Sequence, residues 1–98
     1  TEQASRDKNL DIKVAVLPAA AIPRARLMGE TTGMLKAVVD AKTGAILGCA
    51  LHCADAGEMI NVVETAIRAG KDYTFLRDMI YTHPSMTEAL NDLLSKIK

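Results

Sequence analysis

In the first half of the chain, apolar residues tend to alternate with polar ones, and in the second half they recur at helical spacing. Ile12, Val14 and Val16 lie two residues apart, as in a strand that buries one face. Pro18 fits a sheet edge or a bend, because proline has no N–H to donate to a neighbouring strand. We therefore predict a strand within residues 11–22 that runs as far as Pro18.

Two further β segments flank a polar turn. Residues 34–39 and 45–52 are short and apolar, and residues 40–44 between them are rich in turn-forming side chains. Gly44 can adopt the positive φ angle that closes a hairpin of this length. The pattern predicts an antiparallel β-hairpin.

The spacing of apolar residues changes after Cys53. Asp55 and Glu58 have the spacing of a capping box, in which side chains bond the free N–H groups at a helix start. Apolar residues then recur three or four positions apart, at Met59, Ile60, Val62, Val63, Ala66 and Ile67. Gly70 suits the position just after a helix end. The sequence predicts a helix over residues 56–69.

Another helix is predicted late in the sequence, over residues 85–97. Ser85 and Glu88 repeat the capping-box spacing. A stripe of apolar residues follows, at Leu90, Leu93, Leu94 and Ile97. Residues 74–79 could form one short helix between the two longer ones, and the polar residues 1–9 a short helix or a frayed end.

Three predicted strands thus precede the main helices. This order is typical of an α+β fold, in which helices cover an antiparallel β-sheet. The length of 98 residues suits one domain, residues 1–98, and not two. Arg24 and Arg26 lie in a stretch that we expect to be a loop; they could bind a phosphate, but such a pair is more typical of a solvated surface.

Composition excludes several classes of function. Lys and Arg number 12, as do Asp and Glu, and this balance argues against the basic surface expected of a nucleic-acid-binding protein. Aromatic residues make up only 3% of the chain, which disfavours platforms that stack bases or sugars. No apolar run is long enough to span a membrane, and no signal sequence opens the chain. We expect a cytoplasmic protein without nucleic-acid or membrane partners.

The two cysteines raise the possibility of a small metal-binding module. Cys49, His52 and Cys53 are three soft or borderline ligands within five residues. On a regular strand Cys49 and Cys53 share one face and His52 points to the other, so one metal ion could not bind all three without a bulge. Four strand residues also span about 13 Å, too far for a disulfide. We expect reduced thiols and no metal, and keep a metal-binding or protein-interaction module as the alternative function.

The segment THPSMTEAL allows two interpretations. In the simpler one, Ser85 and Glu88 only cap a helix, Pro84 precedes it, and His83 is an ordinary loop residue. In the chemical one, Glu88 reaches back to His83, fixes its tautomer and orients the second ring nitrogen as an acid/base. The local pattern by itself leaves both open.

The same segment resembles the His-Pro-x-x-x-Glu ending of the flavin-dependent pyridine nucleotide-disulfide oxidoreductases, such as glutathione reductase, dihydrolipoamide dehydrogenase and mercuric reductase. Three other segments resemble the family in the same order: TEQA, GMLKAVVDAKTGAILG and ADAGEMINVVETAI. Within the family, AIPRARLM and THPSMTEALNDLLS are most similar to the reactive-chlorine-resistance type.

The resemblance implies that this is the C-terminal dimerisation, or interface, domain of such an enzyme. It would form a homodimer and pack against the FAD and NAD(P) domains of the parent chain. His83 would be the acid/base that serves the redox-active dithiol of the partner subunit, Glu88 its orienting partner, and Pro84 the cis-proline after it. The parent would be an NAD(P)H-dependent flavin oxidoreductase that reduces disulfides or metal ions.

Other parts of the family pattern are not found in the sequence. There is no G-x-G-x-x-G turn for FAD or NAD(P) and no C-x-x-x-x-C disulfide. The family strand that precedes the Thr-Glu helix is also missing. We therefore expect a domain excised from a longer flavoenzyme, without its first strand, that binds no cofactor and is inactive by itself.

Overall fold

The computed structural model describes residues 2–8 and 11–98. A three-stranded antiparallel sheet has the strand order β1-β2-β3, with β1 at Ile12–Pro18, β2 at Met34–Asp40 and β3 at Ile46–His52. The helices are α1 (Glu2–Asp7), the 3₁₀ turn η1 (Ala19–Ala21), α2 (Pro23–Met28), α3 (Ala56–Arg68), α4 (Tyr73–Arg77) and α5 (Ala89–Leu94). The predicted α+β fold is confirmed. The ends of the predicted 1–9 segment, Thr1 and Asn9, lie outside the described residues.

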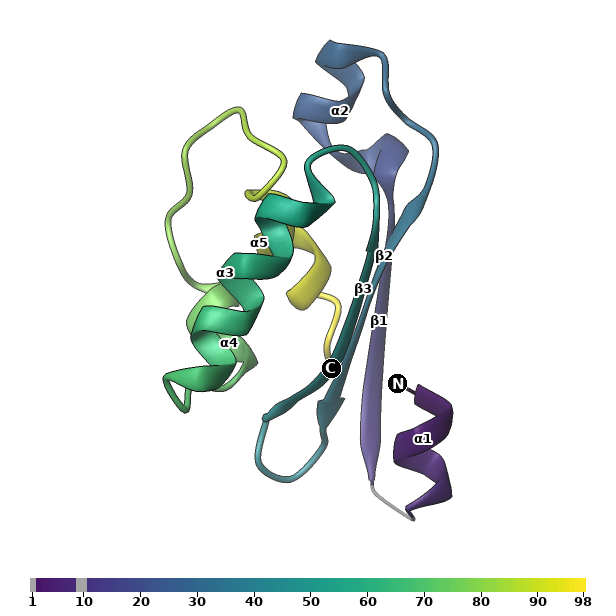
Figure 1. The fold of residues 1–98 in the computed structure, drawn as a ribbon, viewed down its shortest axis with the longest axis vertical. Helices are drawn as coiled ribbons and strands as arrows, with labels where there is room; N and C mark the ends of the chain where they lie inside the picture. The colour runs from purple at the N-terminus through teal and green to yellow at the C-terminus, as the bar shows by residue number, and fades with distance from the viewer. Residues whose placement is uncertain (1, 9–10) are drawn as a thin grey trace.

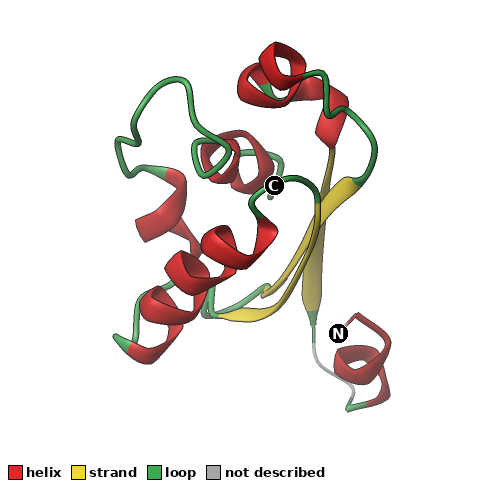
Figure 2. Cartoon of the chain, turned by 45° about the horizontal axis from the view of Figure 1, so that its top comes forward, coloured by secondary structure: helices red, strands yellow, loops and turns green. Residues whose placement is uncertain are grey.

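Helices α3, α4 and α5 gather on one face of the sheet, α1 lies on the other, and α2 sits beyond one end of the strands (Figure 1; Figure 2 separates helices from strands by colour). The core lies between the sheet and α3–α5. Its fully buried side chains include Leu35, Val39, Met59, Leu76, Met86, Leu90 and Leu93. Among the described residues, no helix is long and apolar enough to cross a bilayer.

The β2–β3 hairpin forms where the sequence predicts it. Gly44 has a φ angle of 77°, which favours glycine. The Asp40 carboxylate accepts hydrogen bonds of 2.8 Å from the backbone N–H groups of Lys42 and Thr43, so the turn is held from inside. A register shift between Val38 and Val39 bends the pairing with β3.

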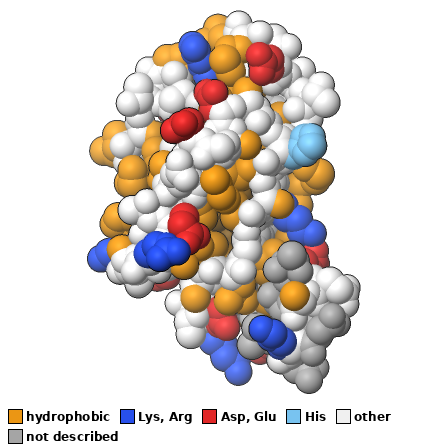
Figure 3. Space-filling model, viewed as in Figure 1, with side chains coloured by type: hydrophobic (Ala, Val, Ile, Leu, Met, Phe, Trp, Pro, Cys, Tyr) orange, Lys and Arg blue, Asp and Glu red, His pale blue; other side chains and the backbone are white. Residues whose placement is uncertain are grey.

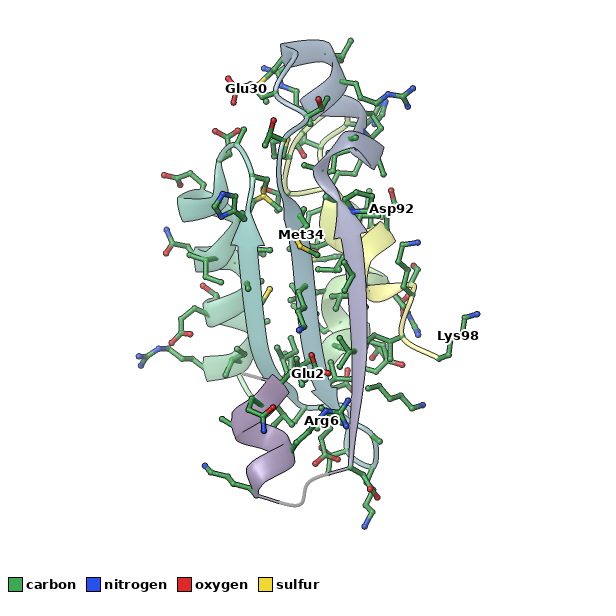
Figure 4. The ribbon with its side chains drawn as sticks, turned by 90° about the vertical axis from the view of Figure 1, so that its right-hand side faces the viewer. Glu2, Arg6, Glu30, Met34, Asp92 and Lys98 are labelled. Carbon is green, nitrogen blue, oxygen red and sulfur yellow. The ribbon has the colours of Figure 1, made fainter. Side chains whose placement is uncertain are left out.

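Helix α1 rests on the face of the sheet opposite the other helices. Glu2 of α1 pairs with Lys36 of β2 and also with Arg6 one turn along the helix. Figure 4 looks onto this face, with Glu2 directed at the strands. Val38 is buried here, whereas Met34, farther along β2, is 48% exposed. Helix α1 therefore covers only part of this face.

Three local expectations are wrong. Residues 23–28 form α2 rather than a loop: Pro23 stands in its first turn, where proline is tolerated, and Arg24 and Arg26 are exposed on it. Asp55 makes no side-chain cap to α3, because its backbone is left-handed, with φ at 60°.

The third concerns the helix predicted over 85–97. Helix α5 covers only Ala89–Leu94. At its start the N–H groups of residues 89, 90 and 91 bond carbonyls three positions back, and those of residues 96 and 97 do the same at its end. These tighter 3₁₀-type turns are common at helix ends. They leave residues 85–88 as a turn outside the α-helix.

Candidate functional site

The candidate site lies in the loop between α4 and α5. This loop contains His83 and Pro84, joined by a cis peptide bond, in agreement with the expected cis-proline. His83 is exposed, with 65% of its side-chain surface accessible. Glu88, at the start of α5, is more covered, with 28% accessible.

Nδ1 of His83 lies 2.7 Å from Oε1 of Glu88. An ionised carboxylate can only accept hydrogen bonds. The ring proton is therefore on Nδ1, and the Nδ1–H group donates a hydrogen bond to Glu88. In the neutral ring this leaves the lone pair on Nε2, which has no partner within residues 2–8 and 11–98. The predicted contact between the two side chains is confirmed, and the arrangement can accept and return a proton at Nε2.

Only half of the predicted capping box forms at Ser85. The Ser85 hydroxyl accepts a 3.2 Å hydrogen bond from the backbone N–H of Glu88, as a cap should. The Glu88 carboxylate bonds His83 and makes no side-chain cap. From the sequence, the Glu88 carboxylate could bond either the helix N-terminus or His83. In the structure it bonds His83.

Two side chains outside the His83–Glu88 pair hold the rest of the loop. Asn91 of α5 donates from its amide nitrogen to the carbonyl oxygens of Arg77, at 2.9 Å, and Met79, at 2.8 Å. The Tyr81 hydroxyl donates to the carbonyl of Leu76 at 2.8 Å. Burial raises the pKa of Tyr81 to about 12, so the phenol stays a donor at neutral pH. The sequence analysis missed Asn91; its one signal was a polar residue next to the apolar stripe of α5.

In the described part of the chain, Cys49, His52 and Cys53 are not gathered into a cluster of metal ligands. Cys49 and Cys53 are half-buried free thiols, and His52 is exposed at the end of β3. No group of three or more His, Cys, Asp or Glu side chains in the described part of the chain is placed to hold a metal ion. The Cys53 Sγ atom lies 3.7 Å from Sδ of Met59, a contact of two soft atoms.

Neither cysteine is activated as a nucleophile. Burial raises the pKa of the Cys49 thiol to about 11, and also raises the pKa of Cys53. The thiolate is the reactive form of cysteine, so both side chains are inert thiols at neutral pH.

An apolar surface surrounds α4 and continues toward the His83 loop. Its exposed side chains are Phe75, Met79 and Ile80. Ile80, three residues before His83, is 95% exposed. An apolar groove of about 260 Å³ lies between α3 and α4. Figure 3 shows hydrophobic side chains on the outer side of the loop that follows α4. We call Phe75, Met79 and Ile80, together with this groove, the α3–α4 apolar surface.

A comparison with models of protein families matches residues 1–94 to the family described as "Pyridine nucleotide-disulphide oxidoreductase, dimerisation domain". The Escherichia coli protein named "Probable pyridine nucleotide-disulfide oxidoreductase RclA" is 55% identical over 98 residues, which are 100% of this chain and 22% of that protein. Mercuric reductase of Bacillus cereus is 38% identical over 90 residues, 92% of this chain and 14% of that protein.

A solved structure has the same fold. The structure titled "HOCl-induced flavoprotein disulfide reductase RclA from Escherichia coli" superimposes with a TM-score of 0.97 at 55% identity, and covers 100% of this chain and 22% of that one. The chain therefore spans about a fifth of the length of this relative.

Proposed function

Since this chain belongs to the family of pyridine nucleotide-disulphide oxidoreductase dimerisation domains, we propose that it joins two subunits of a cytoplasmic flavoenzyme and gives each subunit's dithiol an acid/base from the other subunit. His83 is that acid/base and Glu88 its orienting partner. The relatives' names describe a disulfide oxidoreductase and a mercuric reductase, which supports a parent enzyme of this chemical class.

The observation that carries this proposal is the 2.7 Å contact between His83 and Glu88. Glu88 fixes the Nδ1 proton, so the lone pair of Nε2 is always presented to solvent or to a partner. A histidine that only fills a loop does not need a carboxylate to choose its tautomer. The exposure of the ring leaves Nε2 open to a group from outside the chain.

The proton steps follow from this tautomer. As a thiol of the partner subunit attacks its substrate, Nε2 accepts the thiol proton and the ring becomes an imidazolium. The new charge is stabilised by Glu88 through the Nδ1–H bond. When a thiolate leaves in a later step, Nε2 returns the proton to that sulfur, and the neutral tautomer is restored.

The cofactors belong to other parts of the parent chain in this proposal. The 98 residues contain no G-x-G-x-x-G turn, the element whose backbone cradles the phosphates of FAD or NAD(P). Cys49 and Cys53 are half-buried thiols whose pKa values are raised by burial, and in this proposal they do not serve as the redox-active pair. FAD, when bound elsewhere in the enzyme, would exchange electrons between NAD(P)H and the dithiol.

The two subunits meet through the α3–α4 apolar surface. This surface combines three exposed, large apolar side chains with an apolar groove, and exposed apolar patches commonly mark interfaces. The surface reaches Ile80, in the same loop as His83, so pairing of two chains there would bring the histidine close to the partner.

The catalytic part is tested by measuring the two half-reactions separately in the full-length enzyme by stopped flow. His83→Ala should slow the thiol-dependent half-reaction by roughly 10²–10⁴-fold, the usual contribution of a positioned acid/base. Reduction of the flavin by NAD(P)H should be almost unchanged, because this step needs no proton from His83. Glu88→Gln should have a smaller effect, since it keeps a hydrogen-bonding group.

His52→Ala is the matched control, because His52 is the other histidine of the chain and is also exposed. It should leave both half-reactions unchanged. A wild-type rate in the substrate half-reaction of His83→Ala would refute the catalytic role.

The association is tested by light scattering of the 98-residue chain across a concentration series. Ile80→Glu should raise the dimer dissociation constant by at least about tenfold, since it places a charge in the proposed interface at a site whose exposure makes folding insensitive to the change. Leu27→Glu on α2, where the leucine is 70% exposed, should have no effect. A monomer at high micromolar concentration, or equal effects of the two variants, would contradict the proposed surface.

A further inference from the structure

Ser85 contacts the backbone on both sides of the candidate acid/base pair. Its hydroxyl donates a 2.7 Å hydrogen bond to the carbonyl oxygen of Thr82, the residue just before His83. The same oxygen accepts the 3.2 Å hydrogen bond from the backbone N–H of Glu88. One hydroxyl therefore links the backbone that enters His83 to the backbone that carries Glu88.

The contacts exceed what a helix cap requires. A cap only accepts hydrogen bonds from free N–H groups, and the bond from Ser85 to Thr82 serves no N–H group. The N–H group of Glu88, which donates a hydrogen bond to the Ser85 oxygen, lies before Ala89, the first residue of α5. The two hydrogen bonds connect both ends of the turn of residues 82–88 to Ser85 in its middle. The His83–Glu88 contact spans the same turn.

We propose that Ser85 is a positioning residue that holds His83 and Glu88 at hydrogen-bonding distance. The inference rests on the proposed function for its catalytic meaning, but its structural content concerns the tautomer of His83 and can be measured without any reaction. Ser85 touches neither ring nitrogen, so it acts through the backbone on both partners.

The consequence of losing the hydroxyl follows from the geometry. Without it, the Thr82 carbonyl and the Glu88 N–H have no common partner, and residues 82–88 can open. His83 and Glu88 then meet for only part of the time, because their side chains are the remaining link across the turn. The Nδ1–H tautomer loses its acceptor, and the ring reverts toward the mixture of tautomers of a histidine side chain free in water.

The experiment is ¹⁵N NMR of the two ring nitrogens of His83 in the 98-residue chain, at a pH where the ring is neutral. Wild type should show the proton on Nδ1. Ser85→Ala should shift population to the Nε2–H tautomer, and Ser85→Thr should restore the wild-type spectrum, since it keeps the hydroxyl. In the Glu88→Gln background, Ser85→Ala should add no further change, because the carboxylate whose position matters is already gone.

Ser95→Ala is the matched control. Ser95 lies in the same C-terminal region, and its hydroxyl also donates to a backbone carbonyl, that of Asn91 at 2.6 Å. Its loss should leave the His83 ring signals unchanged even if it lowers the thermal midpoint. An unchanged tautomer in Ser85→Ala, or an equal change in Ser95→Ala, would overturn the inference.

The full-length enzyme separates this inference from the proposed function. Ser85→Ala should lower kcat of the thiol-dependent half-reaction by roughly 10–100-fold, as expected for a displaced catalytic group, and leave flavin reduction unchanged. If the tautomer changes in Ser85→Ala but His83→Ala reacts at the wild-type rate, the positioning role stands and the catalytic role of His83 fails. If His83→Ala is slow and the tautomer is unaffected by Ser85→Ala, the catalytic role of His83 stands and the positioning role of Ser85 fails.

Discussion

Gly33 packs directly against the backbone of His52, where the open end of the β2–β3 hairpin meets the loop from α2. A Cβ atom placed on Gly33 would lie 1.8 Å from the carbonyl oxygen of His52, far inside any allowed contact. Gly33 also has a φ angle of 114°, which side chains rarely adopt. The close approach of the two backbones therefore requires glycine at this position.

Gly33→Ala should destabilise the chain by about 2–4 kcal/mol, because the clash is with backbone and cannot be relieved by a rotamer change. Urea denaturation of the 98-residue chain measures the loss. Gly57→Ala is the control: a Cβ at Gly57 in α3 meets nothing within 4 Å, and alanine should stabilise the helix by about 0.5–1 kcal/mol. Similar stabilities for the two variants would contradict this account.

Asn91→Ala should loosen the loop that carries His83. The change removes both hydrogen bonds to the carbonyl oxygens of Arg77 and Met79, and should cost about 1–3 kcal/mol of unfolding free energy. Hydrogen exchange of the amides in residues 78–83 should accelerate more than exchange in β2. Asn61→Ala, on the exposed side of α3, should change neither quantity. Uniform acceleration across the whole chain would show that Asn91 supports the fold and not this loop.

Cys49 should react slowly with alkylating reagents. Because burial raises the pKa of its thiol to about 11, roughly 0.1% is thiolate at pH 8, against about a quarter for a free cysteine. In a Cys53→Ser variant, labelling of Cys49 at pH 8 should be roughly 250-fold slower than that of a free thiol, and should increase about tenfold per pH unit up to pH 10. Rapid labelling at pH 8 would indicate an activated thiol and reopen a redox role for Cys49.

Acid should weaken the hairpin turn through Asp40. Backbone hydrogen bonds from Thr43 and Lys42 hold the pKa of this carboxyl below its ordinary value of 3.8. The folded state therefore binds the proton less readily than the unfolded state, so the stabilisation is present above that value and is lost as the pH falls through the folded pKa. Asp40→Asn should be less stable than wild type near neutral pH, and the difference should shrink below about pH 4.

Urea midpoints between about pH 7 and about pH 2.5 test this prediction. Asp92→Asn, which removes an exposed carboxylate on α5, should run parallel to wild type. A difference between Asp40→Asn and wild type that stays constant over the whole range would refute the proposed origin of the effect.

Most of the fold followed from local patterns. The hairpin was predictable because its two determinants, Asp40 and Gly44, lie within one five-residue turn. The Asp40 carboxylate accepts a backbone hydrogen bond and Gly44 adopts a positive φ angle, as these residues commonly do in turns. Helix α3 was predictable because its apolar face repeats over four turns. The predicted resemblance to the dimerisation domain of disulfide oxidoreductases is likewise confirmed by the family match and by the 55% identity to RclA.

The sequence failed where a residue had more than one local option. Asp55 and Glu58 have capping-box spacing, but the chain leaves β3 with Asp55 in a left-handed turn, which carries the side chain away from the helix. Pro23 to Met28 contain few signals for a helix of this length, yet their backbone closes into α2 with Ala25 fully buried. In both places the local sequence allows several conformations of similar energy, so its pattern does not decide between them.

At the candidate site, the sequence determined which groups were available and the tertiary structure determined how they combine. His83, Ser85 and Glu88 were all identifiable from their order, since a carboxylate five residues after a histidine can reach it across a turn. Whether Glu88 caps the helix or holds the histidine was not decided locally, because both partners lie within reach of one flexible side chain. The fold decided it through contacts distant in sequence: burial of Met86 and Leu90 against the sheet fixes the start of α5, and Asn91 anchors the loop from α4. Together with the two hydrogen bonds of Ser85, these contacts hold the turn at the distance that lets Glu88 bond His83.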